Sequence, residues 1–150
     1  GGFSCIDCPN TQTCGAGRCS SGGGGGGGGG GTVTYPSVAG ASFNTAFTIF
    51  PISGCGGSAS NSTGTVTFTI GSTTQSGDMK VLETGKTQQL ICPWTQTGYG
   101  VSANCDYSGV TSRWELTLSS NGRGISGSGF VKDNSGNACS EIQFSVSGAR

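Results

Sequence analysis

Three segments of the chain alternate strictly between apolar and polar residues. They are residues 65–70, TVTFTI, residues 113–119, RWELTLS, and residues 141–148, EIQFSVSG. A period of two places alternate side chains on opposite faces of a β-strand, so each segment is expected to bury one face. The residues expected on the buried faces are Val66, Phe68, Ile70, Trp114, Leu116, Leu118, Ile142, Phe144 and Val146. Since no ten-residue window shows a helical stripe, the chain is predicted to be all-β.

Weaker strand patterns and turn signals fill the rest of residues 32–150. The weaker strands are expected at residues 32–38, 46–50, 79–84, 87–92 and 125–131. Asn121 and Gly122 suit a tight hairpin because both residues tolerate positive φ, and residues 133–137, DNSGN, are expected to form a turn. About eight short antiparallel strands joined by short turns predict a β-sandwich or a small up-and-down β-barrel.

The cysteines indicate an oxidising compartment. Eight cysteines without any histidine are more typical of disulfides than of a metal site, so the chain is expected to be extracellular or at a cell surface. Residues 1–21 are predicted to be a disulfide knot, with a cysteine metal site as the alternative. The cysteines of this knot are Cys5, Cys8, Cys14 and Cys19. Of the three pairings open to the other four, we favour Cys92 with Cys105 and Cys55 with Cys139.

Ten consecutive glycines, Gly22 to Gly31, lie between this segment and the β-domain expected at residues 32–150. As a free coil the run spans about 17 Å, and held extended it reaches roughly 31 Å. Glycine has no side chain, so its backbone can pack closely against another backbone. We interpret the run as a tether that reaches a neighbouring molecule. Phe3 and Ile6, the large apolar residues before it, are candidates for docking into that neighbour.

Low charge and missing histidine exclude several functions. Only 9% of the residues are charged, and seven basic residues balance seven acidic ones. Such a surface attracts neither nucleic acid nor anionic lipid and favours self-association. No apolar run is long enough to span a membrane. Without histidine, the common general base is absent, and no cofactor or metal is expected.

Paired carboxylates remain a formal route to acid–base catalysis. The acidic residues that could form such a pair are Asp78, Glu83, Asp106, Glu115, Asp133 and Glu141. Glu115 and Glu141 fall on the polar phase of their strands, whereas Asp78 and Asp133 fall in expected turns. The chain is therefore expected not to be an enzyme.

One segment could recognise a ligand. Residues 92–105, CPWTQTGYGVSANC, are expected to form a disulfide-held loop. Aromatic faces and amide side chains of this kind recognise sugars or proteins. The candidates are Trp94, Gln96, Tyr99 and Asn104, with Tyr107 just beyond. In the alternative interpretation, Trp94 and Tyr99 cover a barrel end as part of the core. A separate sequon at Asn61 is a candidate glycan acceptor in a loop.

The glycine run with its flanks, CSSGGGGGGGGGGTVTY, the four later cysteines and the ending ISGSGFV…CSEIQFSVSGAR together resemble bacterial cell-envelope lipoproteins. In that family a glycine-rich tether leads into a small, cysteine-containing β-domain. The resemblance covers residues 19–150 and implies an exported β-protein. Neither Cys5 nor Cys19 follows a lipobox, so we do not extend a lipid anchor to this chain.

These observations lead to two functional expectations. The first is a non-enzymatic extracellular structural or adhesive subunit that assembles with copies of itself into a filament or surface polymer. Low charge density and the glycine tether support it. The second is a monomeric β-domain that binds a carbohydrate or another small ligand, with Trp94 and Tyr99 in contact with it.

Overall fold

The chain divides into two compact units, Gly1–Tyr35 and Pro36–Arg150. The computed structural model describes residues 12–15, 18–21, 31–52, 54–107 and 109–150. The strand expected at residues 32–38 is wrong beyond Thr32, which ends a short strand. Pro36 has no N–H to donate to a sheet, and the N–H of Val38 donates to a side chain instead. The segment therefore enters the second unit as irregular backbone.

The described part of the first unit is a small antiparallel sheet. It contains β1 (Gln12–Gly15), β2 (Arg18–Ser21) and β3 (Gly31–Thr32) in the order β2-β1-β3. Cys14 lies opposite Cys19 on one side and opposite Gly31 on the other. The strands that flank the glycine run thus belong to one sheet, whereas the tether interpretation placed the run between two units. Phe3, Cys5, Ile6, Cys8 and Gly22 lie outside the described residues.

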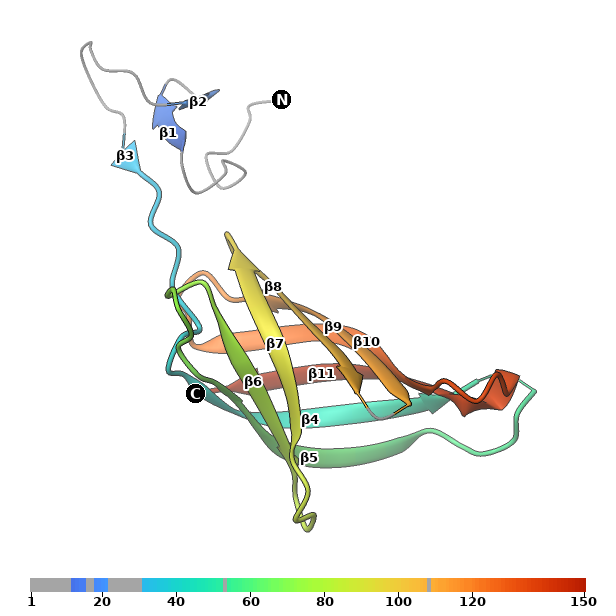
Figure 1. Cartoon of the computed structure of the whole chain (residues 1–150). Helices are drawn as coiled ribbons and strands as arrows, with labels where there is room; N and C mark the ends of the chain where they lie inside the picture. The colour runs from blue at the N-terminus through green and yellow to red at the C-terminus, as the bar shows by residue number, and fades with distance from the viewer. Residues whose placement is uncertain (1–11, 16–17, 22–30, 53, 108) are drawn as a thin grey trace. The chain divides into compact units, whose positions relative to one another are not determined.

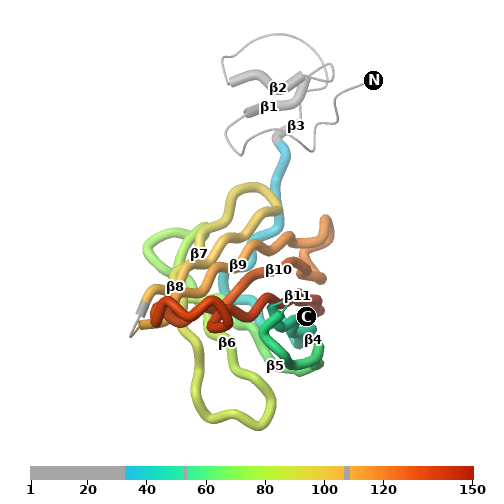
Figure 2. Tube along the Cα trace, turned by 90° about the vertical axis from the view of Figure 1, so that its right-hand side faces the viewer, coloured from blue at the N-terminus to red at the C-terminus, as the bar shows by residue number. Residues whose placement is uncertain are grey.

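The second unit is a closed eight-stranded antiparallel barrel (Figures 1 and 2). Its strands are β4 (Ser42–Pro51), β5 (Ser60–Phe68), β6 (Ser76–Glu83), β7 (Leu90–Thr97), β8 (Gly100–Tyr107), β9 (Val110–Leu118), β10 (Gly124–Asp133) and β11 (Glu141–Ala149). A 3₁₀ turn, η2 (Ala138–Ser140), precedes β11. Each strand pairs with the next, and β11 pairs with β4. The predicted all-β fold is confirmed, and of the two predicted architectures, a β-sandwich or an up-and-down barrel, the structure has the barrel.

Alternation along the strands separates a buried interior from a polar exterior. On β9, Trp114, Leu116 and Leu118 are buried, and Glu115 and Thr117 between them are exposed. Gly129 of β10 faces inward between β9 and β11, and a Cβ there would lie 2.6 Å from the Phe144 ring. Inward glycines of this kind make room for large aromatic rings inside a narrow barrel.

Ile70, expected in the core, is 61% exposed. Strand β5 ends two residues earlier, at Phe68. There the Phe68 N–H donates to the Ala41 carbonyl, and the Phe68 carbonyl accepts from the Gly40 N–H. The segment of residues 36–41, which we name the strap, thus takes over backbone pairing at the end of β5, and the chain turns away before Ile70 can face inward.

Three expected loops or turns are strands instead. Residues 92–105 form the hairpin β7–β8, whose two-residue turn is Gly98–Tyr99. Asn61 lies in β5, and Asp78 lies in β6. The hairpin turn at Asn121 is confirmed: it joins β9 to β10, and Gly122 has a φ of 71°. In all three corrected places residues of weak strand propensity still pair across strands, because cross-strand contacts outweigh that propensity.

The strap closes one end of the barrel. Val38 is fully buried, and its N–H donates to Oε1 of Gln96 over 3.0 Å. Nε2 of Gln96 donates to the carbonyls of Pro36 and Gly98, each over 2.8 Å. A Cβ on Gly122 would lie 2.7 Å from Pro36 and 3.0 Å from the Arg150 guanidinium, so both chain ends of the unit meet at this turn.

Both disulfide pairings favoured from the sequence are present. Cys92 and Cys105 join β7 to β8 inside the barrel, where both are buried. Cys55 and Cys139 join the β4–β5 connection to η2 across 84 residues. Two disulfides place this protein outside a reducing cytosol. The described part of the chain contains no helix that could span a lipid bilayer.

Replacing Gln96 with alanine is expected to lower the free energy of unfolding by about 1–3 kcal/mol, because the buried Val38 N–H loses its acceptor. Urea unfolding followed by tryptophan fluorescence measures the change. Gln143→Ala is the control, since Gln143 is exposed on the outside of β11, and it is expected to change the value by about 0.5 kcal/mol or less. Equal unfolding midpoints for the two variants would contradict the role of Gln96.

Candidate functional site

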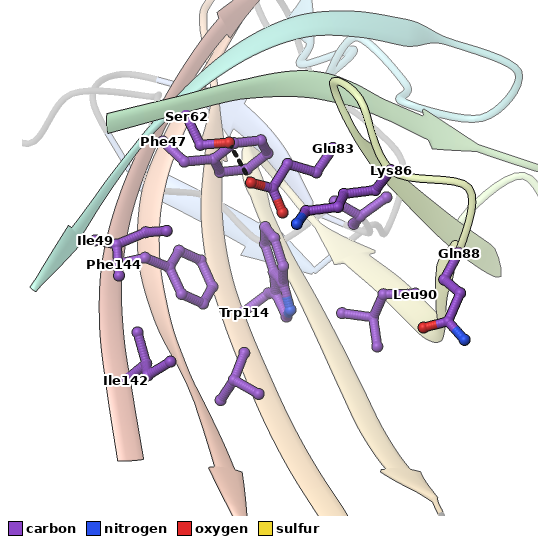
Figure 3. A pocket seen from close by; sticks show the side chains of 12 residues that line it. Phe47, Ile49, Ser62, Glu83, Lys86, Gln88, Leu90, Trp114, Ile142 and Phe144 are labelled. Carbon is purple, nitrogen blue, oxygen red and sulfur yellow. Dashed lines mark hydrogen bonds between the residues drawn. The ribbon is translucent and has the colours of Figure 1, made fainter. Parts of the chain in front are cut away.

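The barrel end opposite the strap opens into a cavity of about 480 Å³. Figure 3 shows the side chains that line it. Eight are apolar: Phe47, Ile49, Val81, Leu90, Trp114, Val131, Ile142 and Phe144. Four are polar: Ser62, Glu83, Lys86 and Gln88. The volume lies in the range of about 300–1,000 Å³ that small-molecule sites occupy.

Strand alternation supplies the apolar wall. Ile49 of β4, Phe144 of β11, Gly129 of β10 and Trp114 of β9 follow one another across the paired strands on the inner face. The Trp114 and Phe144 rings lie 4.3 Å apart between centroids. Because Gly129 separates them on the backbone without a side chain, the two rings contact each other directly over β10.

A buried hydrogen-bond chain holds Trp114 in place. Its Nε1 donates to Oγ of Ser112 over 2.8 Å, and Ser112 Oγ donates to the Phe130 carbonyl over 3.1 Å. Trp114 is 4% exposed and Ser112 is fully buried. A buried indole N–H requires such an acceptor. The ring that forms much of the cavity wall is therefore fixed in orientation before any ligand binds.

The mouth of the cavity is open and covalently braced. In an up-and-down barrel alternate connections lie at the same end, so those after β4, β6, β8 and β10 surround the mouth. The Cys55–Cys139 disulfide ties the first of these connections to the last. Ile142, the second residue of β11, lies in phase with the buried residues Phe144 and Val146. Its side chain is nevertheless 45% exposed. Its side chain lines the cavity at the point where solvent enters.

Polar groups gather on one side of the mouth. Glu83 ends β6 in phase with the buried residues Met79 and Val81, so its side chain faces inward. Ser62 Oγ donates to Glu83 Oε1 over 2.6 Å. The Lys86 N–H donates to the Glu83 carbonyl over 3.0 Å, which closes a turn. Figure 3 shows the Glu83 carboxylate and the Lys86 side chain on the same side of the cavity.

Sequence reasoning noticed Glu83 only as one of six acidic residues. The signal that distinguishes it is its phase: a carboxylate two positions after Val81, on a face that is otherwise apolar. Lys86 and Gln88 carry no such signal, because they belong to a connection rather than to a strand.

The ligand candidates from residues 92–105 do not meet in one site. Trp94 is buried near the strap end, with its Nε1 donating to the Thr69 carbonyl, and Gln96 holds the strap. Tyr99 is partly buried in the β7–β8 turn, and Asn104 is exposed outside β8, opposite Arg113. Tyr107 ends β8, with its side chain outside the described residues. Trp94 thus fills the core, as the alternative interpretation expected.

Other acidic residues lie outside the cavity. Arg113 donates two hydrogen bonds to Asp106 on the barrel exterior, and this guanidinium holds the pKa of Asp106 below its ordinary value. Hydrogen bonds from Ser135 likewise lower the pKa of Asp133, in the expected turn. Glu115 accepts from Ser102 on the outer face. Within the described part of the chain, no three cysteine, aspartate or glutamate side chains gather as metal ligands.

The sequon residue Asn61 is exposed on the outside of β5, where its Oδ1 accepts from the Thr48 hydroxyl over 3.2 Å. The next residue, Ser62, points inward to Glu83. Strand alternation therefore separates the sequon asparagine from the cavity.

Comparison with family models, with curated proteins and with solved structures finds no match for this chain. We therefore infer its function from the chemistry of the cavity and of the strands around it.

Replacing Ser112 with alanine is expected to lower the free energy of unfolding by about 1–3 kcal/mol, because the buried Trp114 N–H loses its acceptor. Chemical unfolding measures the change. Ser102→Ala is the matched control: its hydroxyl donates to Glu115 on the exposed outer face, so the expected change is about 0.5 kcal/mol or less. If both variants unfold at the same denaturant concentration, the buried hydrogen-bond chain does not stabilise the cavity wall.

Proposed function

We propose that the barrel binds a small, mainly apolar molecule in its cavity, outside the cytosol. The observation that carries this proposal is the cavity itself: eight apolar side chains line about 480 Å³ of space, and four polar groups accompany them. Water gains few hydrogen bonds from such a wall. A ligand that displaces it gains roughly 25 cal/mol for each Å² of apolar surface removed from water.

The site is built before the ligand arrives. Strand pairing fixes the backbone around it, Ser112 orients Trp114, and the Cys55–Cys139 disulfide braces the mouth. Binding to a preformed site loses little free energy to the ordering of side chains. The proposed ligand therefore enters with little change in the barrel.

Exposure at the mouth supports the same function. Ile142 is 45% exposed although it continues the buried face of Phe144 and Val146. Apolar surface that is open to solvent and continuous with a cavity is typical of a ligand site. A bound apolar molecule would cover this side chain.

Ile142→Trp is expected to block the site, because the indole fills the mouth of the cavity. Titration with N-phenylnaphthylamine, an uncharged dye that fluoresces in apolar surroundings, measures binding. The wild-type protein is expected to bind one dye molecule per chain, and the variant about tenfold more weakly or worse, because the dye and the indole compete for the same space.

Ile91→Trp is the matched control. Ile91 is also an exposed isoleucine, at 49%, but it lies on the outside of β7, opposite Lys80. This variant is expected to bind the dye as the wild type does. No dye binding by the wild type, or equal loss in both variants, would refute a ligand site in the cavity.

Self-assembly through the first unit is a second proposal and rests on a different observation. Pairing of β11 with β4 leaves the barrel without an edge strand, whereas β2 and β3 are the outer strands of the small sheet. Edge strands can pair with another chain, and a chain in which only 9% of the residues are charged resists this weakly. A structural subunit at a cell surface would assemble in this way.

Light scattering of the full chain over a wide concentration range tests assembly. A mass that rises with concentration is expected, with filaments visible in micrographs. A constant monomer mass and no filaments would exclude this second function and leave ligand binding untouched.

A further inference from the structure

We infer that the cavity selects a compact apolar molecule with one uncharged polar end, a hydroxyl or an amide, held between Glu83 and Lys86. The inference rests on the proposed binding of a ligand in the cavity and adds the chemistry of its polar end.

Glu83 supplies hydrogen-bond acceptors inside the mouth. It is partly buried, and Ser62 Oγ donates to its Oε1 over 2.6 Å. A carboxylate has about four acceptor positions on its two oxygens, so one hydrogen bond from Ser62 orients the group and leaves other acceptor positions open. The carboxylate can therefore still accept a hydrogen from a ligand.

Lys86 supplies donors on the same side. Its backbone N–H bonds to the Glu83 carbonyl over 3.0 Å, and both side chains line the cavity (Figure 3). A lysine ammonium has three donors and no acceptor. The two residues together offer hydrogen-bond acceptors and donors on the polar side of the cavity, which Ser62 and Gln88 also line.

Their opposite charges decide which polar end fits. A cationic ligand gains from Glu83 and is repelled by Lys86, and an anionic ligand experiences the reverse. A charged end also loses more hydration on entering an apolar cavity than a neutral one does. A hydroxyl or amide both donates and accepts, so it uses both residues and meets neither penalty.

The rest of the wall determines the shape of the ligand. Trp114 and Phe144 contact each other and cover the side formed by β9 and β11. Polar lining groups come from β5, β6 and the β6–β7 connection. One polar end on one apolar body matches this division.

Calorimetric titration near neutral pH with three ligands that share one rigid body tests the inference. These are adamantanol, adamantylammonium and adamantane carboxylate. The wild-type protein is expected to bind adamantanol at least about threefold more tightly than either charged ligand, the scale of a partly exposed charge interaction.

Two variants should shift the preference between the two charged ligands in opposite directions. Glu83→Gln retains an oxygen for Ser62 and removes the negative charge, so the carboxylate ligand should gain at least about threefold over the ammonium ligand. Lys86→Gln should shift the preference equally toward the ammonium ligand. Glu115→Gln is the control, because Glu115 is exposed on the outside of β9, and it should leave the order unchanged.

Failures of the inference and of the proposed function are distinguishable. If all three ligands bind with equal affinity, or if both cavity variants keep the wild-type order, the inference is overturned and ligand binding stands. The same holds if N-phenylnaphthylamine binds and none of the three adamantanes does. If the dye also fails to bind, the proposed function fails and the inference with it.

Discussion

The pairing of β11 with β4 is the interaction on which the rest of the second unit depends. Eight consecutive hairpin partners would otherwise form an open sheet with two free edges. Closure gives every strand two neighbours and turns one face of each strand into an interior. The strict alternation of the sequence then places every second side chain inside the barrel, where residues such as Phe144 are enclosed by the other strands.

The closed barrel has two ends, and they differ in structure. At one end Oε1 of Gln96 accepts from the Val38 N–H, so Val38 can be buried in the same core as Trp94. At the other end the barrel holds the cavity, which Lys86 and Gln88 of the β6–β7 connection help to line. Phe47 of β4, Trp114 of β9 and Phe144 of β11 line the cavity there, although each ring is largely buried. A filled end and a hollow end thus arise from one barrel through the position of six residues before β4.

Much of this fold can be predicted from the sequence, whereas the cavity cannot. Alternation around Phe68, Trp114 and Phe144 predicts strands and buried faces, because side-chain direction is a local property of a strand. Strand β8 is missed because Gly100, Ser102 and Asn104 carry weak strand propensity and depend on their neighbours. A cavity depends on the register of several strands around a barrel, and no local pattern encodes the space left between them. Trp94 and Asn104 come from the same segment of the sequence, but Trp94 points into the barrel and Asn104 points out of it.

The first and last residues of the second unit lie at the same turn, and this has a topological consequence. Pro36 and Arg150 both lie against Gly122, at the end closed by the strap. A short covalent linker can therefore join them, and the ring of eight strands can be reopened at a connection on the opposite side. Domains whose termini lie close together tolerate circular permutation and insertion into other proteins. In this barrel such a rearrangement would preserve every strand pair, including the one between β4 and β11 that the native chain must form between its most distant strands.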